Sequence, residues 1–196
     1  MLYLDNDTLI TLAELNILKF FCAAMAEEHE DYNLFCLRRC PAFVSDQVNE
    51  PVRTEVLTFL KKVGPVSEHL RGREFAELSP IHQVDVEAEL FACCANDEGT
   101  LVVTGDLKAV RAVSKHASST TKGKLKGKMR CTEQCVLAII DHEGFQKVAQ
   151  CWSTSTIDHA FFETLIGESE ASVRSKLDGR LKDLTHHMKQ LLGIVP

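Results

Sequence analysis

The chain has 196 residues, of which 45% are hydrophobic and 26% are charged, and its formal net charge is −6. These values are near globular averages, so they exclude a disordered chain and predict one domain with a C-terminal extension. The acidic balance argues against a protein that coats nucleic acid through its overall charge, although a local basic patch can still bind it. No run of about 18 apolar residues and no secretory signal pattern occurs, so we expect no membrane contact and a cytoplasmic location.

Hydrophobic periodicity and turn signals predict strands that alternate with helices. For residues 29–45 the sequence pattern does not decide the secondary structure. The expected elements are, in chain order, a strand over 1–4, a helix from Leu9 to Phe21 capped by Asp7 or Thr8, a helix over 52–63, a helix from Val84 to Ala95, a strand over 100–103, a helix from Leu107 to Ser114, a short strand from Met129 to Cys131, a long helix from Glu133 onward, and helices over 157–166 and 170–192.

This alternation predicts an α/β domain with a parallel sheet and right-handed crossovers. Ligands of such sheets bind beyond the carboxyl ends of the strands, where Asp5, Asp106 and the Thr132-Glu133 turn would gather. We expect this domain to cover residues 1–150. Residues 151–196 would then form a helical extension packed on the same domain, as a lid or a docking element.

Glu87 is a carboxylate in an unexpected place. With Leu90, Phe91 and Cys94 it follows helical spacing, so it would head the apolar stripe that faces the sheet. Such a position requires either a buried Lys or Arg partner or a metal ion. Asp85 is predicted to lie on another face, where it can cap the helix.

Carboxylates that converge in one pocket repel one another, by on the order of 4 kcal/mol for two charges about 4 Å apart at an effective dielectric near 20. A divalent cation removes this repulsion. Oxygen ligands suit hard ions such as Mg²⁺ or Mn²⁺, which support phosphodiester hydrolysis by orienting water and stabilising the leaving oxygen.

Three stretches resemble the acidic blocks of PIN-domain proteins in order and approximate spacing: "LYLDNDTLITLAELNIL", "VDVEAELFACCANDEGTLVVTGDLKAV" and "KMRCTEQCVLAIIDHEGF". The resemblance covers about residues 1–148. It implies a three-layer, Rossmann-like α/β/α sandwich that binds Mg²⁺ or Mn²⁺ and cleaves single-stranded RNA, often as the toxin of a toxin–antitoxin pair. The family's acids would fall on Asp5, Glu87 and Asp106, with Asp7 and Glu133 as further metal ligands.

The chain departs from the family at two places. The early-helix glutamate of many members has only Glu50 and Glu55 as candidates by position. Lys108 stands where toxin-type members often carry a further acid. This lysine could hold a phosphate, or it could pair with Glu87 or Asp106 and take the place of a metal.

A basic segment runs from Lys122 to Arg130 with five cations at alternate positions. In an extended conformation all five would share one face and could contact phosphates. The other interpretation is a solvated, mobile loop. The residues assigned to substrate binding are Lys108, Lys124, Lys126, Lys128 and Arg130.

Two other interpretations of these acidic residues remain open. One is a PIN-like scaffold without activity, which would bind a protein such as an antitoxin or a second copy of the chain. Another is a haloacid-dehalogenase-type phosphatase with Asp5 as nucleophile and Asp7 as acid/base. Against it, the glycine expected after Asp7 is missing, and Val110 stands where a late aspartate belongs.

The eight cysteines are expected to be reduced. The pairs Cys36/Cys40 and Cys131/Cys135 have the wrong spacing and surroundings for a structural zinc site, so we expect small buried core residues. No cysteine stands in an evident nucleophile setting, and no glycine-rich phosphate loop occurs.

Overall fold

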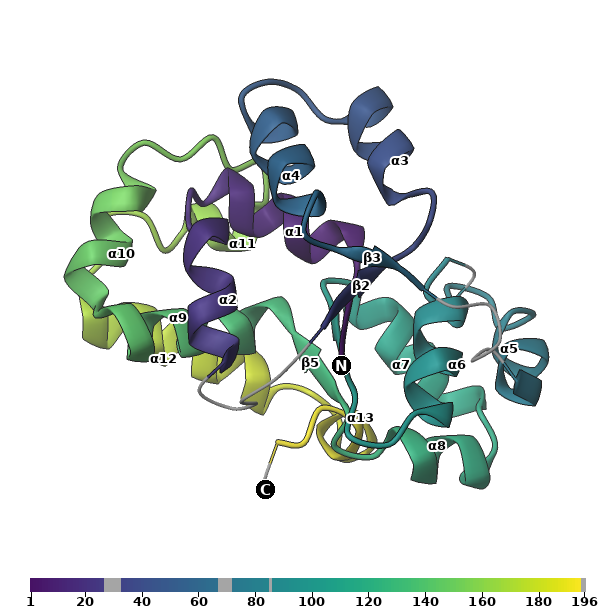
Figure 1. Cartoon of the computed structure of the whole chain (residues 1–196). Coiled ribbons are helices and arrows are strands. Elements are labelled where there is room, and N and C mark those ends of the chain that lie inside the picture. The colour runs from purple at the N-terminus through teal and green to yellow at the C-terminus, as the bar shows by residue number, and fades with distance from the viewer. Residues whose placement is uncertain (27–32, 67–71, 85, 195–196) are drawn as a thin grey trace.

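The computed structural model describes residues 1–26, 33–66, 72–84 and 86–194. Its sheet has five parallel strands in the order β3-β2-β1-β4-β5 (Figure 1). This confirms the predicted α/β class with a parallel sheet. The strands are β1 (Leu2–Leu4), β2 (Leu34–Cys36), β3 (Gly64–Pro65), β4 (Leu101–Thr104) and β5 (Met129–Cys131).

Helices connect these strands and continue beyond the last one. They are α1 (Asn6–Glu14), α2 (Leu18–Ala26), α3 (Cys40–Gln47), α4 (Val52–Leu60), α5 (Gly72–Leu78), α6 (Ala88–Asn96), α7 (Leu107–His116), α8 (Ser119–Leu125), α9 (Thr132–Glu143), α10 (Phe145–Trp152), α11 (Ala160–Glu163), α12 (Glu170–Lys182) and α13 (His186–Leu191).

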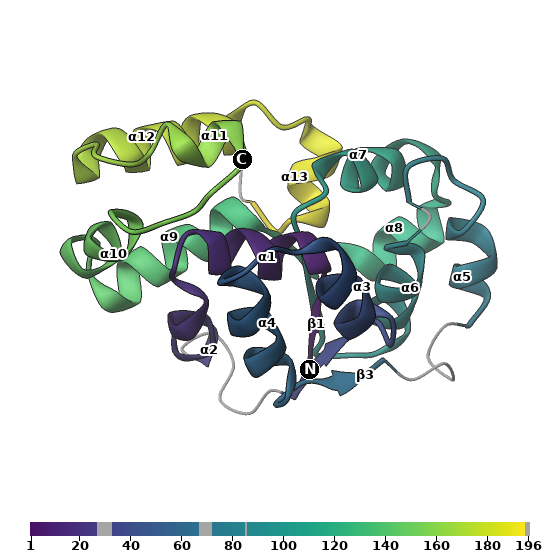
Figure 2. The ribbon, with the colours of Figure 1, turned by 90° about the horizontal axis from the view of Figure 1, so that it is seen from above.

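Helices cover both faces of the sheet, which gives three layers (Figures 1 and 2). Strand side chains alternate between the faces, so Leu4 and Val103 enter one core whereas Tyr3 and Val102 enter the other. The first core is closed by α1–α4 and α9–α12, and the second by α5–α8 and α13. Both faces of the central strands are therefore buried, as is usual for parallel sheets.

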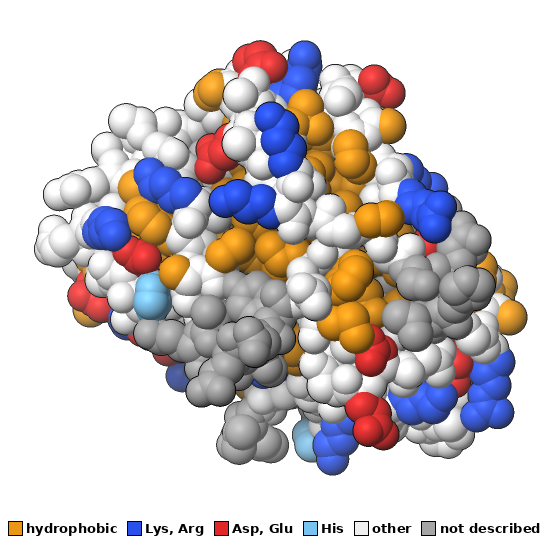
Figure 3. All heavy atoms as spheres, in the orientation of Figure 1, with side chains coloured by type: hydrophobic (Ala, Val, Ile, Leu, Met, Phe, Trp, Pro, Cys, Tyr) orange, Lys and Arg blue, Asp and Glu red, His pale blue; other side chains and the backbone are white. Residues whose placement is uncertain are grey.

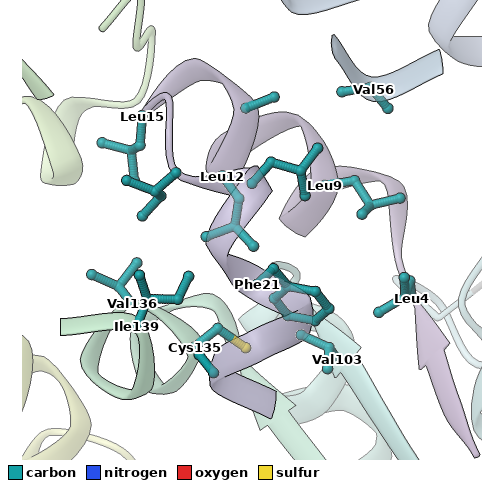
Figure 4. Close-up of a cluster of buried hydrophobic side chains, with 14 of the residues drawn as sticks. Leu4, Leu9, Leu12, Leu15, Phe21, Val56, Val103, Cys135, Val136 and Ile139 are labelled. Carbon is teal, nitrogen blue, oxygen red and sulfur yellow. The ribbon is translucent and has the colours of Figure 1, made fainter. Parts of the chain in front are cut away.

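The first core fixes the helices that begin beside the carboxyl ends of the strands. Figure 4 shows α1, α2 and α9 converging on the sheet. Full burial of one aliphatic side chain contributes about 1.5–3 kcal/mol, so this contact holds the starts of α1 and α9 firmly. The buried side chains labelled there are Leu4, Leu9, Leu12, Leu15, Phe21, Val56, Val103, Cys135, Val136 and Ile139.

Two of the expected helices are interrupted. The helix predicted from Leu9 to Phe21 is two helices, because Asn16 has a left-handed φ of 58° between α1 and α2. The helix expected over 170–192 breaks between α12 and α13, where Thr185 starts a new helix as a side-chain cap.

The C-terminal extension packs on both cores. Phe162 and Val173 belong to the first core, and Met188 and Leu191 to the second. An ion pair of 2.7 Å between Arg174 and Asp141 joins α12 to α9. The boundary expected at residue 150 falls inside α10.

No single helix of the described residues has both the length and the hydropathy to cross a membrane. The helices α1 and α2 pass that test only as a pair, which is bent by 117° at the break between them. On the surface, hydrophobic side chains gather toward the middle of one face, with Lys and Arg around them (Figure 3).

Candidate functional site

The sheet places two predicted acids beside each other. Asp5 follows β1, and its backbone N–H donates to the carbonyl of Val103 on β4 at 3.0 Å. The Asp5 side chain is 2% exposed. One of its oxygens, Oδ2, accepts hydrogen bonds from Thr104 Oγ1 at 3.1 Å and from the Gly105 N–H at 3.4 Å. The end of β4 therefore orients the Asp5 carboxylate.

Asp106 is fixed as the N-cap of α7. Its Oδ1 accepts from the N–H groups of Lys108 and Ala109, at 2.7 Å and 3.0 Å. Its own N–H donates to Thr104 Oγ1 at 3.1 Å. Thr104 thus links both aspartates, because its hydroxyl donates to Asp5 and accepts from Asp106.

Asp7 lies in the first turn of α1, directly against the end of β4. A Cβ added at Gly105 would be 3.1 Å from Asp7 Cβ and 3.3 Å from Thr132 Oγ1. A side chain at position 105 would therefore require its neighbours to shift by a few tenths of an ångström. The expected cap of α1 is wrong, since Asp5 occupies the N-cap position and its side chain makes no capping hydrogen bond.

Glu87 reaches the other acids from the start of α6. This helix begins at Ala88 rather than Val84, so Glu87 is its N-cap residue. Leu90, Phe91 and Cys94, which follow Glu87 at helical spacing, are buried in the second core. No ion pair of Glu87 occurs within the described residues, so the alternative of a Lys or Arg partner, including Lys108, finds no support there. The capping role expected for Asp85 lies outside the described residues.

Burial and mutual repulsion raise the pKa of three of these acids. Burial and the charge of Asp7 raise the pKa of Asp5 to about 7. Burial and the charges of Asp5, Asp106 and Asp7 raise the pKa of Glu87 to about 7. Burial and Asp106 also raise the pKa of Asp7, against an opposing contribution from His159. We call Asp5, Asp7, Glu87 and Asp106 the acid cluster.

The acid cluster offers only carboxylate oxygens, which are the donors that Mg²⁺ and Mn²⁺ prefer. Burial and repulsion raise the pKa of Asp5 and of Glu87, so a nearby positive charge would favour their ionised forms. Within the described ranges, no three His, Cys, Asp or Glu side chains already stand in a metal-binding arrangement. The donor type therefore fits such an ion, whereas the carboxylates would have to draw closer together to bind it.

Glu133, the fifth predicted metal ligand, is engaged elsewhere. It is buried in the first turn of α9 and forms an ion pair with Arg180 of α12 at 2.5 Å. The Arg180 guanidinium also lies 4.3 Å from the centroid of the Phe161 ring. This pairing ties the C-terminal extension to the domain and neutralises Glu133.

The extension, which was expected to act as a lid or a docking element, also forms a wall of the site. Asp7, Glu133, His159 and Arg180 line one cavity of about 240 Å³. Glu14 positions this wall, because its carbonyl accepts from the Thr156 N–H at 3.0 Å. Residues 155–159 have no helix or strand, so periodicity gives no signal for their approach to Asp7.

The basic segment is neither extended nor free along its length. Lys122 and Lys124 belong to α8, and only 129–131 form a strand. Lys124 Nζ pairs with the buried Glu74 at 2.7 Å, and Lys128 Nζ donates to the carbonyl of Asp97 at 2.9 Å.

Arg130 continues this pattern, because its Nη1 donates to the carbonyl of Met129 at 2.9 Å and to that of Leu192 at 3.2 Å. Lys126 is exposed, just before β5. Because the strands are parallel, the residues before β5 lie at the edge of the sheet opposite to the acid cluster. Of the predicted substrate contacts, Lys108 alone lies near the cluster, exposed in the first turn of α7.

The candidates for the early-helix glutamate do not join the acid cluster. Glu50 and Glu55 line another cavity, of about 650 Å³, between α1 and α4. The side chain near Asp5 from that part of the chain is Cys40, at the start of α3. A hydrogen bond with Cys36 and burial raise the pKa of the Cys40 thiol. Cys36, Cys40, Cys131 and Cys135 are buried and reduced, as predicted.

No known protein family, curated protein or solved structure matches this chain. The acid cluster and its surroundings are therefore the basis for a functional assignment. The position that a dehalogenase-type phosphatase would fill with a late aspartate is Val110, which is buried in α7.

Proposed function

We propose that this protein is a PIN-like, metal-dependent ribonuclease that hydrolyses phosphodiester bonds of single-stranded RNA. The observation that carries the proposal is the acid cluster: four carboxylates at the carboxyl end of a parallel sheet, without a basic side chain paired to Asp5, Glu87 or Asp106 in the described part of the chain. Burial and repulsion raise the pKa of three of them, Asp5, Asp7 and Glu87. Ligands of parallel sheets bind at this edge.

Asp5, Glu87 and Asp106 would hold Mg²⁺ or Mn²⁺, with Asp7 as an outer ligand. When bound, the ion would lower the pKa of a water and stabilise negative charge on the phosphate. We exclude Glu133 from this ligand set, because its carboxylate already pairs with Arg180.

Thr104 would act as the positioning residue of the site. Its hydroxyl holds Asp5 and Asp106 through two hydrogen bonds, so both carboxylates approach from fixed backbone positions. Protons compete with the metal below pH 7, since Asp5 and Glu87 each titrate at about 7. Activity should therefore rise through neutral pH.

Cleavage of a labelled single-stranded RNA with Mn²⁺ or Mg²⁺ tests the proposal. The wild type should cleave, and Asp106→Asn and Glu87→Gln should lower the rate at least 100-fold. Asn keeps the side-chain oxygen that caps α7, so Asp106→Asn removes charge without removing the cap. Glu98→Gln, on the turn after α6, is the matched control and should cleave normally.

The product ends give a second readout. Attack by water leaves a phosphate monoester, whereas attack by the ribose 2′-hydroxyl leaves a cyclic phosphate. A monoester, and cleavage of a substrate with a 2′-deoxy nucleotide at the scissile position, are expected. A cyclic product would refute metal-directed hydrolysis.

A second candidate is a PIN-like scaffold that binds a protein partner, such as an antitoxin or another copy of the chain. It is favoured by the absence, within the described residues, of three side chains already placed to hold a metal. In that case Mn²⁺ would change neither the melting temperature nor RNA integrity, and the acid variants would retain partner binding.

A further inference from the structure

Helix α7 carries a row of basic side chains that starts beside the acid cluster. Lys108, Arg111 and Lys115 are exposed, whereas Ala109, Val110, Ala112 and Val113 are buried. The spacing i, i+3 and i+7 places the three cations on one side of the helix. At about 1.5 Å rise per residue, the row from Lys108 to Lys115 is about 10 Å long, and it starts two residues after the N-cap residue Asp106.

This row borders a surface hollow. The turn at residues 80–83 and the last two turns of α7 enclose a cavity of about 430 Å³, with His82, Arg111, Lys115 and His116 in its lining. Gln83 in that turn has a φ of 77°, which residues with a side chain rarely adopt. The hollow thus combines basic side chains with a turn held in a costly conformation.

The cations of α7 differ from those of the predicted basic segment. Lys124, Lys128 and Arg130 contact buried acids or backbone carbonyls. For Lys108, Arg111 and Lys115, no ion pair occurs within the described residues. Solvated cations can bind phosphates without first breaking an internal ion pair.

We propose that Lys108, Arg111, Lys115 and His82 form a binding face for the phosphate backbone of a single-stranded nucleic acid, which we call the α7 basic face. A strand on this face would run along α7 toward Asp106, so its backbone would enter the acid cluster end-on. Only the path of the strand toward the acid cluster rests on the proposed ribonuclease function. Binding itself needs neither a metal nor cleavage.

The physical reason is the separation of charge on a chain with a net charge of −6. The acid cluster repels phosphates unless a metal neutralises it, so affinity must come from cations outside it. The α7 basic face supplies these cations within one helix length of the cluster. Each phosphate contact releases counterions, which makes binding depend on salt.

The test is the salt dependence of binding. A fluorescent single-stranded RNA of about 12 nucleotides is titrated with metal-free protein in EDTA at pH 6.5, from 20 to 150 mM salt. Arg111→Ala and Lys115→Ala should each lower the slope of log affinity against log salt by about 0.7, and the double variant by about 1.4. At 100 mM salt each single variant should bind about fivefold more weakly.

Lys126→Ala is the matched control. Lys126 is equally exposed but lies at the opposite edge of the sheet, so its removal should leave the slope unchanged. All three residues are exposed, so these substitutions should leave the fold intact, and melting curves check this. An unchanged slope in the double variant, or an equal loss in Lys126→Ala, would overturn the proposal.

Two further outcomes separate this inference from the proposed function. Binding with the expected slopes but no cleavage in Mn²⁺ would refute the ribonuclease and leave the α7 basic face standing. If the double variant still cleaves RNA and its salt slope is unchanged, the α7 basic face is refuted and the ribonuclease proposal stands. If polyglutamate displaces the RNA at equal charge concentration, the face binds acidic polypeptides, and the nucleic-acid assignment is wrong.

Discussion

Gly105 and Asp7 approach each other so closely that a methyl group at position 105 would lie 3.1 Å from Asp7 Cβ. The same methyl group would lie 3.4 Å from the Thr8 backbone nitrogen, which α1 holds in place. Gly105→Ala should therefore destabilise the fold by about 1–3 kcal/mol through overpacking. Urea unfolding measures this change, and Gly123→Ala, where nothing lies within 4 Å, is the control. Equal stability of wild type and Gly105→Ala would contradict the close approach.

Replacing Asp5 by Asn should stabilise the metal-free protein. The hydrogen bonds from Thr104 and Gly105 reach Oδ2, and an amide oxygen can accept them as well. At pH 8 the gain should be about 1–3 kcal/mol, because the variant removes the buried charge of Asp5, whose pKa burial and Asp7 raise to about 7.

The pH dependence follows from the direction of that shift. An acid whose pKa is raised on folding binds its proton more tightly in the folded state, so stability falls as pH rises from about 4 to about 7. The advantage of Asp5→Asn should thus shrink as the pH falls from 8 to 4. Melting temperatures of both proteins over this range measure this difference in stability. A difference that does not depend on pH would show that the pKa of Asp5 is not raised.

Glu133→Gln should lower the stability of the protein, in contrast to Asp5→Asn. It breaks the ion pair with Arg180 and leaves that guanidinium without its partner. We expect a loss of about 1–3 kcal/mol, whereas neutralising a member of the acid cluster should increase stability. Thermal melting of Glu133→Gln beside Asp5→Asn makes the comparison. If both substitutions stabilise the protein, Glu133 repels the other carboxylates, and the ion pair with Arg180 does not stabilise the fold.

Lys124→Met should destabilise the protein and leave RNA binding unchanged. Lys124 Nζ lies 2.7 Å from Glu74 and 3.0 Å from Asn96 Oδ1, and Glu74 is 1% exposed. Removing the ammonium leaves a buried carboxylate with fewer partners, at a cost of about 1–3 kcal/mol. Urea unfolding and RNA titration distinguish this role from phosphate contact. If Lys124→Met binds RNA more weakly but is as stable as the wild type, Lys124 contacts the substrate, as first predicted.

The elements with strong local signals were predicted closely from the sequence. The strand over 129–131 has the predicted bounds, and β1 and β4 differ by at most one residue at either end. Their apolar runs end abruptly in acids or turns. This is also why Asp5 and Asp106 could be placed at one edge of the sheet. By contrast, β2 lies in the interval 29–45, where no clear pattern occurs, and β3 has only two residues, too few for a pattern.

The site residues that were misjudged depend on contacts distant in sequence. Nothing near Glu133 indicates that Arg180 will pair with it, and nothing near Lys124 indicates Glu74. The alternation of cations over 122–130 predicted an extended face, but Ser118 caps a helix there. The row on α7 did carry a helical signal, since Lys108, Arg111 and Lys115 follow its spacing.

The central claim is that the acid cluster binds a divalent metal and uses it to cleave RNA. The decisive measurement is thermal melting of wild type and Asp106→Asn at pH 8, with and without millimolar MnCl₂, with single-stranded RNA cleavage followed in matched samples. At about 100 times the dissociation constant, Mn²⁺ adds about 2.7 kcal/mol, or roughly 5–10 °C, to the wild type. We predict this rise together with cleavage, both lost in Asp106→Asn. No rise and no cleavage in the wild type, or an equal rise in the variant, would contradict the account.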